Sequence, residues 1–294
     1  MLLDELRTLL DRHARPNWTT GVDGVLISRV ERSDPPTPSM SGTVLAVIAQ
    51  GAKRLALGDR VYEYRAGQYL VASVDLPVTG NFVDATPNRP ALGFGLTLEP
   101  SAIADLLLRT SPGAVPRSTR ASAGLAVSDA SPELLDAVVR LLRLLDHPRD
   151  VDVLAPLYKR EILWRLITGP DGATIRQIGL ADSNLTHIAR AVRWIREHYA
   201  TSFRVEDVAR FIGMSPSAFH RNFQAVTAMS PIQFQKQIRL QEARLMLAAH
   251  PEDVASVGHS VGYDSPSQFS REYRRLFGAA PSQDATLLHG AGTP

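Results

Sequence analysis

The last third of this 294-residue chain contains one local pattern twice, and this duplication constrains the fold more than any other feature. In each copy a short, partly apolar stretch ends at a glycine, a serine follows within three residues, and a second amphipathic stretch starts at a proline. The turns lie at residues 213–215 and 262–265. Glycine suits the left-handed backbone of a sharp turn, and serine suits the N-cap of the next helix. The pattern therefore predicts two helix–turn–helix units.

The second stretch of each copy carries two aromatic residues at i and i+4. These are Phe219 and Phe223 in the first copy, and Phe269 and Tyr273 in the second. Residues at this spacing share one helix face, so each pair is expected to be buried while the opposite face stays polar and basic. One glycine–serine turn between helices is common in α-helical proteins. Two copies with matching aromatics and arginines favour the arrangement in which the second helix lies in the DNA major groove.

The stretch between the two copies, residues 231–249, is predicted to form one helix of about 19 residues, or roughly 28 Å. A rod of that length could hold two recognition helices about one DNA turn apart, roughly 34 Å. The two units are expected at 204–228 and 252–277.

Residues 25–98 have a different character, because short apolar stretches alternate with turn residues such as Gln50-Gly51 and Gly58-Asp59. Many short strands with regular turns are typical of an all-β sandwich or barrel. Strands are expected at 25–30, 43–48, 54–57, 61–64, 69–73 and 92–98. The clearest hairpin spans 53–64, since Gly58 and Asp59 tolerate the positive φ of a tight turn.

Helices are expected at the charged N-terminus and at 102–109, 131–146 and 153–168, with a loop or linker over 110–129. Ser131 followed by Pro132 marks the start of a leucine-rich helix. The leucine-rich helices are expected to form core or domain-packing surface. The alternative is a dimer interface, which a protein that binds paired DNA half-sites would need.

Composition narrows the classes of function. The chain has no cysteine, which excludes disulfides, thiolate zinc sites, iron–sulfur clusters and cysteine nucleophiles. Residues 1–150 carry 16 Lys and Arg against 17 Asp and Glu, whereas residues 151–294 carry 16 against 13, so the C-terminal half suits a polyanionic partner. The N-terminus lacks the apolar core of a signal peptide, and no apolar run approaches the roughly 18 residues that span a membrane. A cytoplasmic protein with no membrane partner is expected.

The second copy contains a long and specific motif, VGHSVGYDSPSQFSREYRRLFGAAP, at residues 257–281. With this motif, the stretch from about residue 195 to residue 282 resembles the DNA-binding domain of the AraC/XylS family of transcription regulators. That family usually has a glycine shortly before Ser-Pro in the first unit, whereas this chain has Met229 before Ser230 and Pro231. The resemblance implies binding of double-stranded DNA through the major groove.

The N-terminal part resembles the cupin-like domain of one AraC-type subgroup, on the sequences QGAKR at 50–54, GQYLV at 67–71 and DLPVTG at 75–80. The resemblance implies a domain that senses a small ligand or mediates dimerisation. Metal-binding cupins use several histidines and a glutamate, and no histidine lies between His13 and His147. No metal, cofactor or catalytic residue is therefore predicted, and the sequence does not identify an effector.

Nine side chains on the outer faces of the two recognition helices are predicted to contact DNA. The family's contact positions match Ser217, His220 and Arg221 in the first unit, and Ser267, Gln268 and Arg271 in the second. Gln224 falls on the same exposed side, and Arg274 and Arg275 are expected near phosphates. Arginine can donate to guanine O6 and N7, and glutamine can pair with adenine N6 and N7. The alternatives are a solvated helix face, a phosphate or capping role for His220, and an intramolecular ion pair for Arg271.

Three further groups of residues have two interpretations each. The basic residues of the connecting helix are expected on a solvated face rather than as phosphate clamps: Lys236, Arg239 and Arg244. The aromatics of the β region are expected in the core, with a ligand cavity as the alternative: Tyr62, Tyr64, Tyr69 and Phe82. The arginines of the hairpin either receive an anionic ligand or keep the surface soluble: Arg54, Arg60 and Arg65.

The sequence thus predicts a two-domain α+β protein. A cupin-like β-barrel or sandwich with an N-terminal helix is expected at 1–110, a helical linker for dimerisation or packing at 111–186, and an all-α domain with two helix–turn–helix units at 187–294. The expected function is ligand-modulated transcription regulation without catalysis. The alternatives are a ligand-independent regulator whose N-terminal domain only forms a homodimer or contacts RNA polymerase, and an enzyme that uses the β-barrel.

Overall fold

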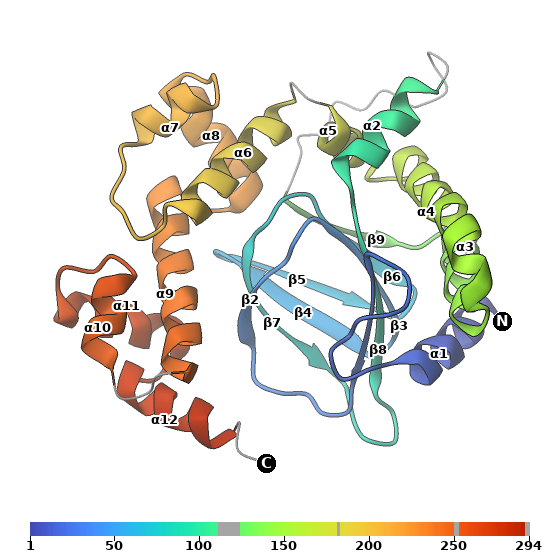
Figure 1. The fold of residues 1–294 in the computed structure, drawn as a ribbon, viewed down its shortest axis with the longest axis horizontal. Coiled ribbons are helices and arrows are strands. Elements are labelled where there is room, and N and C mark those ends of the chain that lie inside the picture. The colour runs from blue at the N-terminus through green and yellow to red at the C-terminus, as the bar shows by residue number, and fades with distance from the viewer. Residues whose placement is uncertain (111–123, 181–182, 250–252, 292–294) are drawn as a thin grey trace. The chain divides into compact units, whose positions relative to one another are not determined.

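The computed structural model describes residues 1–110, 124–180, 183–249 and 253–291 and separates the chain into two compact units (Figure 1). One unit holds residues 1–189 with 225–228, and the other holds 190–224 with 229–294. The first is built on antiparallel sheets with helices at its side, and the second is all helical. The predicted fold class is therefore confirmed. Within the described ranges, no helix is long and apolar enough to cross a membrane.

Two antiparallel sheets form the core of the first unit. The strands of the five-stranded sheet are, in order, β1 (Val25–Val30), β8 (Ala91–Thr97), β3 (Val44–Gln50), β6 (Gln68–Ala72) and β9 (Leu125–Asp129). Those of the four-stranded sheet are β2 (Thr37–Met40), β7 (Pro77–Val83), β4 (Ala52–Leu57) and β5 (Arg60–Arg65).

The six predicted strands and the β4–β5 hairpin are present. Leu57 pairs with Arg60 across the turn, and Gly58 adopts a φ of 60°. Sequence patterning missed β2, β7 and β9. β2 contains Pro38 and β7 starts at Pro77, and proline disfavours strand assignment. β9 lies inside the predicted 110–129 linker and exists because it pairs with β6, with Leu70 opposite Val127. The linker prediction is therefore wrong for residues 125–129.

Helices pack beside the five-stranded sheet (Figure 1). They are α1 (Leu2–His13), α2 (Pro100–Leu108), α3 (Pro132–Arg143), α4 (Val151–Thr168) and α5 (Gly172–Gly179), with short 3-10 turns at Leu144–Asp146 and Pro148–Asp150. Ser131 caps α3 by accepting a hydrogen bond from the amide of Leu134 at 3.2 Å. Leu134, Leu135, Leu141 and Leu142 are all buried, so the core interpretation of this leucine-rich helix is confirmed.

The helices of the C-terminal part are α6 (Asn184–Glu197), α7 (Val205–Phe211), α8 (Pro216–Thr227), α9 (Pro231–Ala249), α10 (Val254–Ser260), α11 (Pro266–Phe277) and α12 (Pro281–Ala291). Four of them start at a proline, which costs no hydrogen bond in a first helical turn. The predicted 231–249 helix matches α9. The start predicted for the second unit, at residue 252, lies outside the described residues.

Candidate nucleic-acid interface

The first helix–turn–helix unit consists of α7 and α8 with the turn between them. Gly213 adopts a φ of 77°, a left-handed conformation that glycine reaches without steric cost. The amide of Met214 donates to the carbonyl of Ala209 at 2.9 Å. The hydroxyl of Ser215 accepts a hydrogen bond from the amide of Ala218 at 3.3 Å and so caps α8. The predicted roles of the glycine and the serine are confirmed.

The second unit, α10 and α11, repeats this arrangement. Gly262 adopts a φ of 91°, and the amide of Tyr263 donates to the carbonyl of Gly258 at 3.0 Å. Ser265 caps α11 by accepting from the amide of Gln268 at 3.3 Å. The second turn is one residue longer, because Asp264 stands between the glycine turn and the capping serine.

The aromatic pairs lie on the inner faces of α8 and α11, as predicted. Phe219 and Phe223 are 0% exposed, with ring centroids 5.3 Å apart and a steep angle between the rings. Phe269 and Tyr273 are also buried, with ring centroids 5.6 Å apart. Because both aromatic residues of each pair are buried on one side of their helix, the opposite side of each recognition helix faces outward.

The outer faces carry the residues predicted to contact DNA. In α8 all four are exposed: Ser217, His220, Arg221 and Gln224. In α11 four of the five are exposed, namely Ser267, Arg271, Arg274 and Arg275, whereas Gln268 is half-buried. Arg221 and Arg271 form no ion pair with any other described residue. The intramolecular pairing considered for Arg271 is therefore not present among them.

A buried carboxylate, Glu272, organises the side of α11 that faces α9. It accepts hydrogen bonds from Lys236 Nζ at 2.8 Å, Tyr263 Oη at 2.9 Å and Gln268 Nε2 at 3.1 Å. Burial by itself would raise the pKa of Glu272, but the hydrogen bonds from Lys236, Gln268 and Tyr263 outweigh it and lower the pKa below its usual range. The hydrogen bond to Glu272 orients the Gln268 side chain and uses one of its amide hydrogens. Its carbonyl oxygen and second amide hydrogen remain available to another partner.

A second buried carboxylate, Asp284 of α12, ties α11 to α9. It accepts from Tyr273 Oη at 2.7 Å and from Arg244 Nε and Nη2 at 2.8 and 3.2 Å. Burial, and then the hydrogen bond to Asp284, raise the pKa of Tyr273, so its hydroxyl stays a donor. Tyr273 therefore both packs against Phe269 and anchors the recognition helix through its hydroxyl.

Arg239 of α9 binds three backbone carbonyls. It donates to Tyr199 at 2.6 Å, to Ala200 at 3.1 Å and to Gly262 at 2.6 Å, and so joins the segment after α6 to the second turn. Burial lowers the pKa of Arg239.

The expectation that Lys236, Arg239 and Arg244 lie on a solvated face holds only in part, because all three are half-buried and donate hydrogen bonds to groups of the protein. Sequence analysis missed Glu272 and Asp284. Glu272 could have been noticed, since it lies three residues after Phe269 and directly before Tyr273, close to the buried face of the helix.

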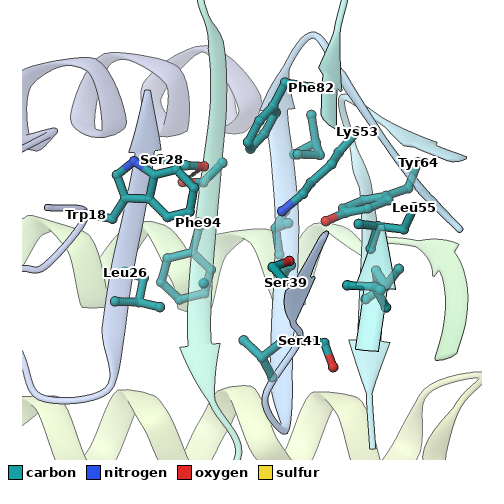
Figure 2. A pocket seen from close by; sticks show the side chains of 18 of the residues that line it. Trp18, Leu26, Ser28, Ser39, Ser41, Lys53, Leu55, Tyr64, Phe82 and Phe94 are labelled. Atoms are coloured by element: carbon teal, nitrogen blue, oxygen red, sulfur yellow. Dashed lines mark hydrogen bonds between the residues drawn. The ribbon is translucent and has the colours of Figure 1, made fainter. Parts of the chain in front are cut away.

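A cavity of about 260 Å³ lies between the two sheets of the first unit, and Tyr64 and Phe82 line it (Figure 2). Both are also buried, so the core interpretation is confirmed for them and they line a cavity as well. Tyr69 is core, with its hydroxyl bound to Asp171 of the loop before α5 at 2.9 Å, and Tyr62 is half-buried. The hairpin arginines are surface residues: Arg54 and Arg65 pair with Glu63, and Arg60 is exposed.

Comparison with known proteins matches both parts of the chain. A family model described as the N-terminus of AraC-type transcriptional regulators matches residues 21–174, and a helix-turn-helix domain model matches residues 208–286. The HTH-type transcriptional regulator ExsA of Pseudomonas aeruginosa is 28% identical over 160 residues, which are 54% of this chain and 57% of that protein. The arabinose operon regulatory protein of Escherichia coli is 31% identical over 97 residues, 33% of each chain. The chain thus spans between a third and somewhat over half of these relatives.

Among solved structures, unsaturated fatty acid-bound ToxT from Vibrio cholerae has a TM-score of 0.56 at 10% identity, with 92% of this chain and 97% of that chain covered. This similarity shows a shared fold that includes both units. The N-terminal family model by itself covers more than half of the chain. Because both matches fall on the regions where the structure has the β-sandwich and the paired helix–turn–helix units, the chain belongs to the AraC-type transcriptional regulators.

Proposed function

We propose that this protein binds double-stranded DNA sequence-specifically, with α8 and α11 in successive major grooves, and that a small molecule in the N-terminal unit modulates this binding. We assign DNA binding to residues 187–294, with units at 204–228 and 252–277, and effector binding to the β-domain at 1–110 together with β9. Its place of action is the cytoplasm.

The observation that carries this proposal is the matched pair of free arginines. Arg221 and Arg271 occupy equivalent positions on the two recognition helices, both are exposed, and neither has an ion-pair partner among the described residues. An unpaired guanidinium on the outer face of a helix can donate two hydrogen bonds to one guanine, and each such contact is worth about 1–3 kcal/mol of discrimination. Ser217, His220, Gln224, Ser267 and Gln268 would flank these contacts, and Arg274 and Arg275 would meet phosphates.

The test is selection of genomic DNA fragments by the full chain at two salt concentrations. We expect a motif of two short boxes about one turn apart, and loss of one box with Arg221→Ala and of the other with Arg271→Ala. Arg60→Ala is the matched control, because it removes an exposed arginine from the β-hairpin. Binding that falls steeply with salt and selects no motif would leave only non-specific phosphate affinity and would refute the proposal.

Ligand modulation is supported by the cavity between the sheets, and a structure of the same fold holds an unsaturated fatty acid. The competing function is a ligand-independent regulator whose first unit forms a homodimer or contacts RNA polymerase. A thermal-shift screen separates the two, because a ligand that binds only the folded chain stabilises it by RT ln(1 + [L]/Kd).

A further inference from the structure

The lining of the cavity between the sheets is mostly apolar. Strands of both sheets contribute apolar side chains, among them Leu55, Phe82 and Phe94 (Figure 2). Leu70 also lines the cavity. Trp18 also lines it and is 44% exposed, so the cavity meets solvent near this residue. An apolar chamber with one open side and a few polar groups is the usual form of a small-molecule site.

One charged side chain, Lys53 of β4, points into this chamber. Strand residues alternate between faces, and Lys53 is in phase with the buried Leu55 and Leu57 and out of phase with the exposed Arg54. It lies directly opposite Tyr64 on β5 and Phe82 on β7. The amine lies 4.8 Å from the centroid of the Phe82 ring.

Lys53 has no counter-ion within the part of the chain that the structure describes. Its neighbour Arg54 is bound to Glu63 on the outer face, whereas no hydrogen bond or ion pair joins the Lys53 amine to another described residue. Burial accordingly lowers the pKa of Lys53. Lys53 is half-buried and its amine has only the face of the Phe82 ring as a described partner, so an anion in the cavity would stabilise its charged form.

A second donor stands beside Lys53. Tyr64 is 1% exposed, and its hydroxyl forms no hydrogen bond with another described residue. In Figure 2 the Lys53 amine and the Tyr64 hydroxyl are directed into the same part of the cavity. Burial raises the pKa of Tyr64, which keeps the hydroxyl protonated and able to donate. An ammonium and a phenol together provide two hydrogen bonds, which suits the two oxygens of a carboxylate.

We propose that the cavity binds a small organic carboxylate, with its carboxylate on Lys53 and Tyr64 and its apolar body against Phe82, Phe94, Leu55 and Leu70. This assignment rests on the proposed effector role of the first unit and specifies the chemical class of the effector. The volume of about 260 Å³ lies just below the usual range for ligand pockets, about 300–1,000 Å³, so the ligand is small. The lining also holds the hydroxyls of Ser28, Ser39 and Ser41, but Ser28 and Ser41 already donate to backbone carbonyls, so few groups remain to pair the hydroxyls of a polyhydroxylated ligand.

The test is isothermal titration calorimetry on the full chain with two matched pairs of probes: benzoate against benzamide, and octanoate against 1-octanol. We expect at least one carboxylate to bind at least ten-fold more tightly than its uncharged partner. Lys53→Met should abolish this preference and weaken carboxylate binding at least ten-fold. Tyr64→Phe should weaken it several-fold. Arg54→Met, one residue away on the outer face, should leave binding unchanged.

A thermal melt without ligand provides an independent check. Lys53→Met removes a charge that no described acid compensates and keeps an unbranched apolar side chain of similar size, so it should raise the unfolding temperature. Equal binding of charged and uncharged probes, no binding of either carboxylate at 10 mM, or unchanged affinity in Lys53→Met would overturn the assignment. Selection of a two-box DNA motif by the ligand-free chain would then still stand, because that experiment does not involve the cavity.

Discussion

In the first helix–turn–helix unit the recognition helix α8 buries its own Phe219 and Phe223, and Phe223 packs against Phe234 of α9. All three side chains are fully buried. In the second, α11 rests on an aromatic pair and on two buried carboxylates, Glu272 and Asp284, each of which receives a tyrosine hydroxyl and a cation. Apolar contacts are non-directional, whereas hydrogen bonds fix direction and cost heavily when one partner is removed. The same turn–helix layout therefore relies mainly on aromatic packing in the first unit, and on aromatic packing together with a buried polar network in the second.

The recognition helix of the second unit is therefore the more specifically positioned of the two, and the more sensitive to the loss of a single hydrogen-bond partner. Its turn glycine is clamped by Arg239, its recognition helix is joined to α9 and α12, and its Gln268 is held by Glu272. No corresponding polar network involving Asn222, the equivalent of Glu272, is present in the described part of the first unit. Substitutions at equivalent positions should therefore have unequal effects.

The largest difference in stability between the two units is expected when their turn glycines are substituted. A Cβ added at Gly262 would lie 2.0 Å from the carbonyl oxygen of Ala200, whereas one at Gly213 meets no atom within 4 Å. Both variants lose about 1–2 kcal/mol because of the left-handed φ. Gly262→Ala adds a backbone clash and should lose about 3 kcal/mol or more in total.

The measurement is native-state hydrogen exchange of the full chain, which reports each unit separately. Amides of α10 and α11 should lose most of their protection in Gly262→Ala, while those of α7 and α8 in Gly213→Ala should lose about ten-fold. Equal losses of protection in the two variants would show that the backbone at Ala200 moves aside at little cost in free energy.

The sequence predicts the helices and turns of the two units better than it predicts the partners of their buried charged residues. The repeated Gly–Ser turns, the aromatic pairs and the exposure of Arg221 and Arg271 follow from local spacing, so the sequence predicts them. The partners of Lys236, Arg239 and Arg244 lie 23 to 40 residues away along the chain, so periodicity could not reveal them. β9 was missed for the same reason, because its partner β6 is remote in sequence.

The next difference is in how the stability of the two recognition helices depends on pH. The pKa of Glu272 is lowered in the folded protein, so its ionised form stabilises α11. That stabilisation is complete above the ordinary glutamate pKa of about 4.3 and is lost as pH falls through the lower folded value. Glu272→Gln should cost about 1.5–3 kcal/mol at neutral pH, because it weakens charged hydrogen bonds from Lys236 and Tyr263.

Hydrogen exchange between pH 3 and pH 6 checks this. In the wild-type chain, protection of α11 should decline with acid more steeply than that of α8, and Glu272→Gln should remove the excess. Asn222→Ala, at the equivalent position of α8, should change stability by less than about 0.5 kcal/mol. A wild-type acid response that is the same in both helices would contradict the assigned role of Glu272.

A smaller inequality is expected in DNA binding, on the basis of the proposed function. The second unit has exposed Arg274 and Arg275 where the first has Gln224 and Ala225. Each phosphate contact contributes about 0.9 to the slope of log affinity against log salt. The double variant Arg274→Gln, Arg275→Gln should reduce the slope by about 1.8, and Gln224→Ala should leave it unchanged. An unchanged slope in the double variant would exclude phosphate contacts by these arginines.

The smallest inequality lies at the C-terminal ends of the recognition helices. Gly278 ends α11 with a φ of 81°, and Ala228, 50 residues earlier, takes a φ of 58° after α8. The residue at the position equivalent to Gly278 is therefore Ala228, not Met229, and its left-handed backbone is strained because it is not a glycine. Because the left-handed conformation costs a non-glycine residue about 1–2 kcal/mol and glycine costs up to about 1 kcal/mol in the unfolded chain, Ala228→Gly should stabilise α8 by about 0.5 kcal/mol. Gly278→Ala should destabilise α11 by about 1 kcal/mol. Exchange protection measured in both variants decides the matter: a loss of protection in Ala228→Gly would mean that contacts of the Ala228 methyl group outweigh the strain.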